Sequence, residues 1–139
     1  MINRPFHYAF KVKDIASTRR FYVEILGCPE GRSTETWIDF DLFGNQLSAH
    51  ISDKLPELDY CGHVDGIRVP IPHFGCILSE QQFLTVAQKL EAAGITFIVK
   101  PYRRYEGQTG EQLTMFVLDL SGNPIEFKAF KNEAEVFAG

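Results

Sequence analysis

Two short stretches that lie far apart in this 139-residue chain match: "DLFGNQL" begins at Asp41 and "DLSGNPI" begins at Asp119. The similarity continues when "HYAFKVKDIASTRRF", which starts at His7, is placed beside "HFGCILSEQQFLTVA", which starts at His73. The strand and helix signals of the two stretches then coincide. An internal repeat constrains the fold more than composition does, because both copies must form the same supersecondary unit.

The first copy has the pattern of a strand, a helix and further strands. Phe6 to Val12 has the β-branched and aromatic content of a strand, Asp14 is a helix N-cap, and Gly27 lies where a C-terminal glycine belongs. A short extended piece is predicted between Cys28 and Ser33. Two strands, "TWIDFDLF" and "QLSAHIS", follow and are separated by the turn pair Gly44-Asn45.

The second copy repeats this order. Pro72 to Leu78 is a predicted strand, and Ser79 with Gln82 forms a capping box for a helix that ends at Gly94. The strands "ITFIV", "EQLTMFVLD" and "NPIEFKAF" follow, and "PYRRYEGQTG" is a predicted loop. The stretch from Asp53 to Ile71, between the copies, has no clear period and is predicted to be a long connecting loop.

The predicted fold class is therefore α+β, with two tandem βαβββ modules. We expect one domain over residues 1–139, with a first module at about 5–52, a linker at about 53–71 and a second module at about 72–130. A chain of this length buries roughly two-thirds of its unfolded surface, so it can form a core without disulfides or other cross-links.

Composition excludes several classes of protein. The net charge is −4 and basic residues form no run longer than Arg19-Arg20 or Arg103-Arg104, so no nucleic-acid partner is predicted. No apolar stretch approaches the roughly 20 residues that span a bilayer, and the N-terminus has no signal-peptide core. The three cysteines fit neither a redox motif nor a disulfide framework, which predicts a reducing, cytoplasmic setting.

Each copy begins with a histidine whose neighbour on the same face is small. Residues two apart in a strand share a face, so His7 lies beside Ala9 and His73 lies beside Gly75. A small neighbour leaves room beside the imidazole for a ligand. Taken alone, either histidine also fits a hydrogen-bonded residue at a strand end.

Glu126 favours the functional interpretation. It alternates with Ile125 and Phe127, which face the core, so Glu126 points to the opposite face. Two neutral imidazoles and one carboxylate form a 2-His-1-carboxylate set that suits Fe(II) and also Mn(II) or another divalent ion. The predicted metal ligands are therefore His7, His73 and Glu126.

His50 is a further candidate. The matched glycines make Ser48 the strict equivalent of Glu126, and His50 lies one step beyond it on the same face, roughly 6–7 Å away. This position allows two roles: a fourth metal ligand, or a catalytic base beside an open metal.

Paired βαβββ modules with "HYAFKV", "PHFG" and "DLSGNPIEFKAF" resemble the vicinal oxygen chelate superfamily, which includes glyoxalase I, bleomycin- and fosfomycin-resistance proteins and extradiol dioxygenases. The resemblance covers nearly the whole chain and is closest to small single-domain predicted extradiol dioxygenases. It implies curved mixed sheets around a divalent metal, with ligands at His7, His73 and Glu126. It also implies a substrate with two adjacent oxygens, and Arg104 and Tyr105 are candidates for closing over that substrate.

Three activities follow from the resemblance. The first is a ring-cleaving dioxygenase that uses Fe(II) and a catechol-like substrate. The second is a glyoxalase I-like lyase or isomerase that uses Zn or Ni. That branch adds a ligand from the last strand of the first module, where the usual glutamate is absent and this chain offers His50. The third is a small-molecule binding or resistance protein. Relatives pair their modules within a chain or between chains, and we expect a homodimer.

Overall fold

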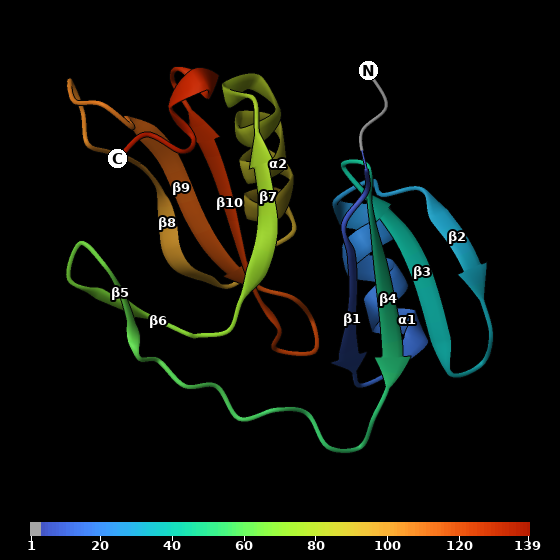
Figure 1. Cartoon of the computed structure of the whole chain (residues 1–139). Helices are drawn as coiled ribbons and strands as arrows, with labels where there is room; N and C mark the ends of the chain where they lie inside the picture. The colour runs from blue at the N-terminus through green and yellow to red at the C-terminus, as the bar shows by residue number, and fades with distance from the viewer. Residues whose placement is uncertain (1–3) are drawn as a thin grey trace. The chain divides into compact units, whose positions relative to one another are not determined.

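A computed structural model describes residues 4–139, so the first three residues of the predicted domain lie outside the described part. The chain divides into two compact units (Figure 1). The first unit comprises residues 4–57 together with Asp119–Asn123. The second unit comprises Leu58–Leu118 together with Pro124–Gly139. Each unit is described by itself.

The first unit contains one four-stranded sheet with a helical segment. Its elements are β1 (His7–Val12), α1 (Ile15–Arg19), η1 (Arg20–Ile25), β2 (Glu30–Ser33), β3 (Trp37–Leu42) and β4 (Asn45–Ile51). The strand order is β1-β4-β3-β2, with β1 parallel to β4 and the other pairs antiparallel. This is the predicted strand–helix–three-strand order.

The helix of the first unit begins where the sequence predicts. The carboxylate of Asp14 accepts a hydrogen bond of 2.7 Å from the backbone N–H of Ser17, which is an N-cap contact. The predicted single α-helix is instead a short α-helix followed by the π-helical turn η1, which buries Phe21, Tyr22 and Ile25. Gly27 follows with a φ of 80°, as expected for the glycine after a helix.

Tyr22 is the largest fully buried side chain of this unit. Its hydroxyl donates a hydrogen bond of 2.8 Å to Asp119 Oδ2, and burial raises the pKa of Tyr22 well above its ordinary value. Asn123 donates from Nδ2 to the carbonyl of Lys11 at 2.8 Å. The Asp119–Asn123 segment therefore completes the core and backbone hydrogen bonding of the first unit.

The second unit repeats the arrangement and adds a hairpin. Its elements are β5 (Gly62–Val64), β6 (Ile67–Val69), β7 (Phe74–Leu78), α2 (Glu80–Ala92), β8 (Phe97–Arg104), β9 (Gln112–Leu118), β10 (Pro124–Phe130) and the 3₁₀ turn η2 (Glu133–Glu135). The main sheet has the order β7-β10-β9-β8, with β7 parallel to β10. The two modules of the predicted repeat therefore have the same strand order.

The predicted capping box of α2 is confirmed. Ser79 accepts from the backbone of Gln82, and the Gln82 side chain accepts from the backbone of Ser79. The buried side chains of α2 form its apolar stripe: Phe83, Val86, Ala87 and Leu90. None of the helices in residues 4–139 is long and apolar enough to cross a membrane.

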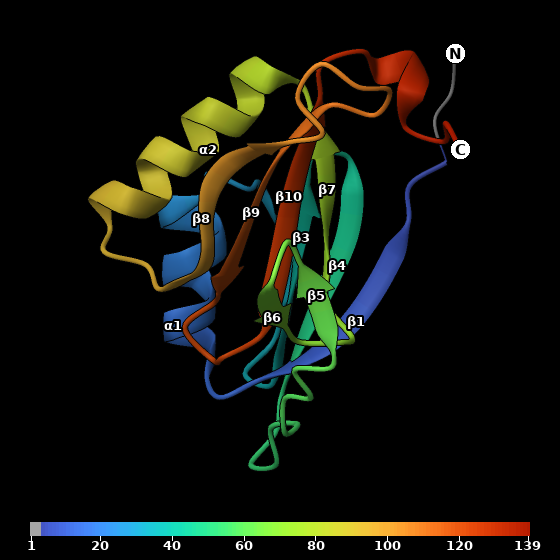
Figure 2. The ribbon, with the colours of Figure 1, turned by 90° about the vertical axis from the view of Figure 1, so that its left-hand side faces the viewer.

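Two further segments differ from the prediction. The region predicted as a structureless linker contains the β5–β6 hairpin, whose turn is formed by Asp65 and Gly66 with φ values of 48° and 87°. The predicted loop that starts at Pro101 begins as strand, because β8 continues to Arg104. Register shifts between β8 and β9 accompany the bend of β8 that is visible in Figure 2.

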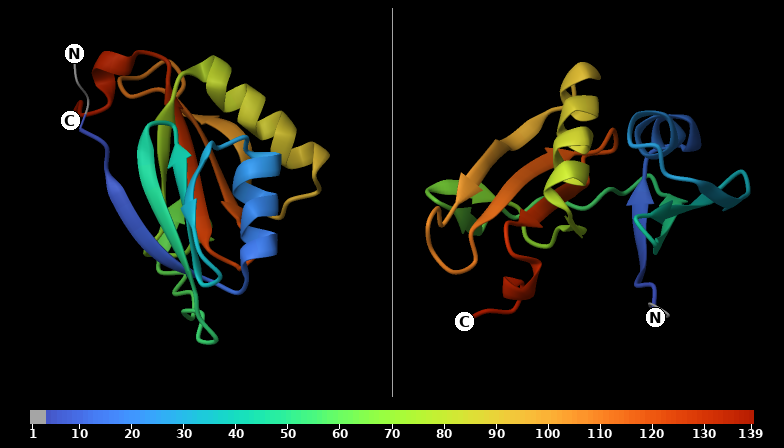
Figure 3. Two further views of the ribbon diagram at one scale, coloured as in Figure 1. Left: turned by 90° about the vertical axis from the view of Figure 1, so that its right-hand side faces the viewer. Right: turned by 90° about the horizontal axis from the view of Figure 1, so that it is seen from above.

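The hairpin packs on the main sheet of the second unit. Val64 and Val69 form a buried cluster with Val99 and Phe116. Figure 3 shows the hairpin and α2 on opposite sides of this sheet. The face that does not contact the helix is therefore partly covered by residues of the predicted linker.

Candidate metal centre

The second unit brings His73 and Glu126 together. His73 immediately precedes β7, and its Nε2 lies 3.2 Å from Oε1 of Glu126 on β10. The register pairs Gly75 with Glu126, and a Cβ built on Gly75 would lie 1.6 Å from the Glu126 carbonyl oxygen. Only glycine permits this close approach of the two strands, so Gly75 fixes the distance between the strands that carry the pair.

The tautomer of His73 follows from its second contact. Its Nδ1 lies 2.8 Å from the carbonyl oxygen of Pro70, and a carbonyl only accepts, so Nδ1 carries the proton. Nε2 then has a free lone pair that faces a carboxylate, and a cation must lie between the two acceptors. A proton meets this requirement, since the hydrogen bond to Glu126 raises the pKa of His73. A divalent metal would meet it equally well.

Glu126 is positioned by its second oxygen. The side chain is 9% exposed, and Thr114 donates from Oγ1 to Oε2 at 2.6 Å. The ring of Phe116 meets the His73 imidazole edge to face, with centroids 4.8 Å apart. One carboxylate oxygen is therefore held by a hydroxyl, and the other is left for the imidazole side of the site.

His7 is oriented in the same way in the first unit. Its Nδ1 lies 2.8 Å from Oε1 of Gln46, the residue with which it pairs in the sheet. An amide oxygen accepts, so Nδ1 of His7 also carries the proton and Nε2 has the lone pair. Both predicted histidine ligands therefore have the tautomer that leaves Nε2 for a metal.

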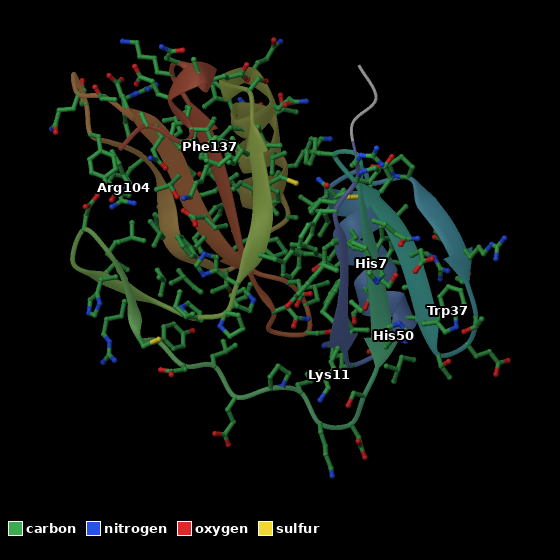
Figure 4. The ribbon with its side chains drawn as sticks, in the orientation of Figure 1. His7, Lys11, Trp37, His50, Arg104 and Phe137 are labelled. Carbon is green, nitrogen blue, oxygen red and sulfur yellow. The ribbon has the colours of Figure 1, made fainter. Side chains whose placement is uncertain are left out.

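His50 lies further along the same face of the first sheet. It pairs with Lys11 on β1 and with Trp37 on β3, and its ring centroid is 6.3 Å from that of Trp37 (Figure 4). Because His7 pairs with Gln46, His50 is four residues beyond His7 along the strands, about 13 Å. Within the first unit this spacing argues against one metal being shared by His50 and His7.

Arg104 and Tyr105 lie together at the other edge of the second sheet. Arg104, which is labelled in Figure 4, donates from Nε to Asp65 Oδ2 at 2.9 Å. Its guanidinium stacks over the Tyr105 ring. Tyr102 also donates to the Asp65 carboxylate, and burial followed by this hydrogen bond raises the pKa of Tyr102 to about 12. Arg104 thus holds the hairpin turn.

The donor set fits a divalent metal, although the structure groups only part of it. Within residues 4–139, no three His, Cys, Asp or Glu side chains gather closely enough to hold an ion. His73 and Glu126 form a pair in the second unit, and His7 belongs to the first unit. The facing lone pairs of His73 and Glu126 are the observation that fits a cation.

Sequence analysis missed the residues that support this pair. Thr114 and Phe116 both contact it, and alternation along "EQLTMFVLD" places both on one face. The hairpin was missed as well, although Asp65-Gly66 between Val64 and Ile67 is a strong two-residue turn signal. Lys128, two residues after Glu126, is a further residue outside the predicted ligand set.

Comparisons with known proteins identify the family and the fold. Residues 4–127 match the profile of the Glyoxalase/Bleomycin resistance protein/Dioxygenase superfamily. A structure of a glyoxalase/bleomycin resistance protein/dioxygenase from Alicyclobacillus acidocaldarius is 31% identical, with a TM-score of 0.78 and 97% of each chain covered. No curated protein matches the chain.

Two more distant structures share the fold. The fosfomycin resistance protein FosX from Listeria monocytogenes is 20% identical, with a TM-score of 0.72; the alignment covers 98% of this chain and 100% of that one. A virulence protein from Salmonella typhimurium is 24% identical, with a TM-score of 0.62; the alignment covers 94% of this chain and 98% of that one.

Proposed function

Because the chain belongs to the glyoxalase/bleomycin resistance protein/dioxygenase superfamily, we propose that it is a metal-dependent enzyme that acts on a small molecule with vicinal oxygens. Members of this superfamily typically bind divalent metals. The observation that carries the proposal is the pair of facing acceptors, His73 Nε2 and Glu126 Oε1. The reaction we propose is extradiol-type ring cleavage of a catechol-like substrate.

The proposed metal ligands are His73, Glu126 and His7, and Fe(II) is the proposed ion; Zn, Ni or Mn are the alternatives. A bound Fe(II) with open positions would supply a site for the two substrate oxygens and for O₂. The protein's part is to hold each imidazole with its proton on Nδ1, through Pro70 and Gln46. Thr114 keeps the carboxylate of Glu126 turned toward His73.

His50 is the proposed base that accepts a proton from the substrate diol. Its place beyond Ser48 favours this role, because Ser48 occupies the position equivalent to Glu126 and donates its hydroxyl to Asp39 at 2.7 Å. A carboxylate at that position would favour the isomerase-type four-ligand set, and its replacement by serine favours a more open metal. Arg104 and Tyr105 remain proposed substrate contacts.

The test begins with protein purified without oxygen and loaded with Fe(II). We expect about one metal per chain and cleavage of a simple catechol in the presence of O₂. Glu126→Gln keeps an acceptor for Thr114 but removes the charge, so metal affinity should fall by more than the roughly 10–100-fold typical of losing an outer hydrogen bond. Glu106→Gln, at an exposed loop residue, is the control and should bind metal normally.

Other outcomes distinguish the alternatives. Turnover of a hemithioacetal with bound Zn or Ni, without catechol cleavage, would identify a glyoxalase-type enzyme and contradict ring cleavage. Full metal binding by Glu126→Gln would contradict the ligand set. His50→Ala should keep the metal and lose roughly 10²–10⁴-fold in turnover if His50 is the base. Loss of metal in that variant would make His50 a ligand.

We also propose that residues 1–139 act as one domain and that the protein is a homodimer. The strands β1 and β7 each end a four-stranded sheet, and an unprotected sheet edge favours pairing with another element. The mass in solution, measured by light scattering over a range of concentrations, should be twice that of the 15.8 kDa chain. A monomer mass at every concentration would contradict the dimer.

A further inference from the structure

Lys128 lies beside the proposed metal ligands but has no role in holding them. It is two residues after Glu126 on β10, so both side chains are on the same face of the sheet. The register places it between Ile77 on β7 and Thr114 on β9. Its side chain is 36% exposed, which leaves part of it within reach of a small molecule.

The contact between Lys128 and Glu126 is loose. Lys128 Nζ lies 3.9 Å from Oε1 of Glu126, which is too long for a hydrogen bond. The same oxygen lies 3.2 Å from His73 Nε2, and the other oxygen accepts from Thr114. A cation held by Glu126 and His73 would take up the charge of this carboxylate, and the ammonium of Lys128 would then be available to another anion.

A pocket of about 250 Å³ adjoins this group. Lys128, His73 and Glu126 line it together with Phe74, Gly75, Cys76 and Ile77. Gly75 contributes no side chain, and the Glu126 backbone fills the place where one would stand, so β7 and β10 meet closely beneath the ligands. The pocket therefore combines the proposed ligand pair, an apolar wall at Ile77, and one lysine at its side.

We infer that Lys128 binds an anionic substituent of the substrate, so that the substrate is a vicinal-oxygen compound that also carries a carboxylate. This inference rests on the proposed function and adds the class of substrate to it. A lysine ammonium that is partly removed from water binds a carboxylate by a charge-assisted hydrogen bond. The alternative is that Lys128 only neutralises Glu126, in which case it would affect the metal and not the choice of ligand.

The experiment compares two ligands that differ in charge and hardly in shape: 3,4-dihydroxybenzoate and 3,4-dihydroxybenzamide. The protein is loaded with Zn²⁺, which is redox-inactive, and binding is measured by calorimetry without turnover. We expect the acid to bind more tightly. Lys128→Gln should weaken binding of the acid by about tenfold, the effect of one charged hydrogen bond at a half-exposed site, and leave the amide unchanged.

Two further variants complete the design. Lys128→Arg keeps the charge and should retain the preference for the acid. Lys131→Gln removes an exposed lysine near Glu111, outside this pocket, and should behave like the parent protein. The preference for the acid should also decrease with added salt.

The outcomes separate the inference from the proposed function. Failure of the parent protein to bind Zn²⁺ would refute the proposed metal centre, and the inference with it. Zn²⁺ binding with equal affinities for acid and amide would overturn the inference alone. An equal loss for both ligands in Lys128→Gln, or a change in Zn²⁺ affinity only, would also overturn it and assign Lys128 to the neutralisation of Glu126.

Discussion

The two units have the same backbone register but different side chains at the same places. In the first unit, β1 and β4 pair Ala9 with Ser48; in the second, β7 and β10 pair Gly75 with Glu126. The histidine lies two residues before the small residue in both. The repeat therefore preserves the positions of a site, and only the second unit places a carboxylate next to its histidine.

The neighbouring strand shows the same divergence. Ser48 pairs with Asp39 and donates to it at 2.7 Å, so the first unit has the carboxylate on β3 and the hydroxyl on β4. In the second unit the carboxylate is on β10, and Thr114 on β9 donates to it at 2.6 Å. In each unit a hydroxyl on one of these two strands thus donates to a carboxylate on the other, with the roles of the strands exchanged. This exchange makes the pairs matched controls for each other.

The hairpin is a second difference. β5 and β6 pack Val64 and Val69 on the main sheet of the second unit, beside Phe116 and hence close to His73. The equivalent face of the first unit carries a pocket of about 550 Å³, lined in part by Trp37, Asp39 and Gln46. The linker residues therefore cover part of this face in the second unit.

The largest expected effect tests the close strand approach that only the second unit has. Gly75→Ala would place a methyl group 1.6 Å from the Glu126 carbonyl oxygen, so β7 must move away from β10. We expect a loss of about 3 kcal/mol or more in the free energy of unfolding, at the upper end of overpacking effects. The matched change in the first unit, Ala9→Gly, should cost only about 1 kcal/mol.

Urea unfolding followed by circular dichroism measures both changes. Metal affinity is a second measurement. In Gly75→Ala, displacement of β7 moves His73 and should weaken metal binding. Ala9→Gly does not push its strands apart, so it should not weaken metal binding in this way. Similar unfolding midpoints for the two variants would show that the two strand pairs are equally spaced, contrary to the structure.

A smaller effect is expected from the exchanged hydroxyls. Thr114→Val keeps the shape of a fully buried side chain and removes the donor to Glu126. Metal affinity should fall by about 10–100-fold, as for other outer-shell hydrogen bonds. Ser48→Ala removes the equivalent donor from Asp39 and should leave metal affinity unchanged. Competition with a coloured chelator measures both values, and an equal decrease would place Asp39 in the metal site as well.

Most of the fold was predictable because the signals are local. The alternation of strands, the capping box at Ser79 and the glycine after each helix all follow from the preferences of neighbouring residues. The β5–β6 hairpin was predictable in principle from the turn residues Asp65-Gly66. Its strands are too short to show a clear alternation of apolar and polar residues, so the sequence pattern does not reveal them. The π-helical turn at Arg20 has no such signal, since hydrogen-bond spacing within a helix is not visible in apolar periodicity.

The sequence predicts the types of residue in the site, but not the residues that hold the proposed ligands in position. Alternation places Glu126 opposite the core, and the structure puts its Oε1 beside His73. Thr114 and Pro70 fix the two side chains through contacts between strands and loops. Predicting these contacts requires the strand register, which the sequence alone does not give. The same holds for Lys128, because its distance from Glu126 depends on the conformations of the two side chains.

The smallest expected effect concerns pH and the hairpin that distinguishes the second unit. The hydrogen bond from Tyr102, and next the one from Arg104, lower the pKa of Asp65 below its ordinary value of 3.8. The ionised carboxylate therefore favours the packed hairpin above pH 3.8, and this contribution is lost as the pH falls through the lowered pKa. Amide signals of Val64 and Ile67 should shift or broaden below that pH in NMR spectra. Asp65→Asn should remove this pH dependence, while Ala49 in the first unit should show the same signal in both proteins. If the hairpin signals change with pH in Asp65→Asn as they do in the parent protein, the prediction is wrong. The hairpin would then be held by its apolar residues alone, and the Asp65 carboxylate would not contribute to the difference between the units.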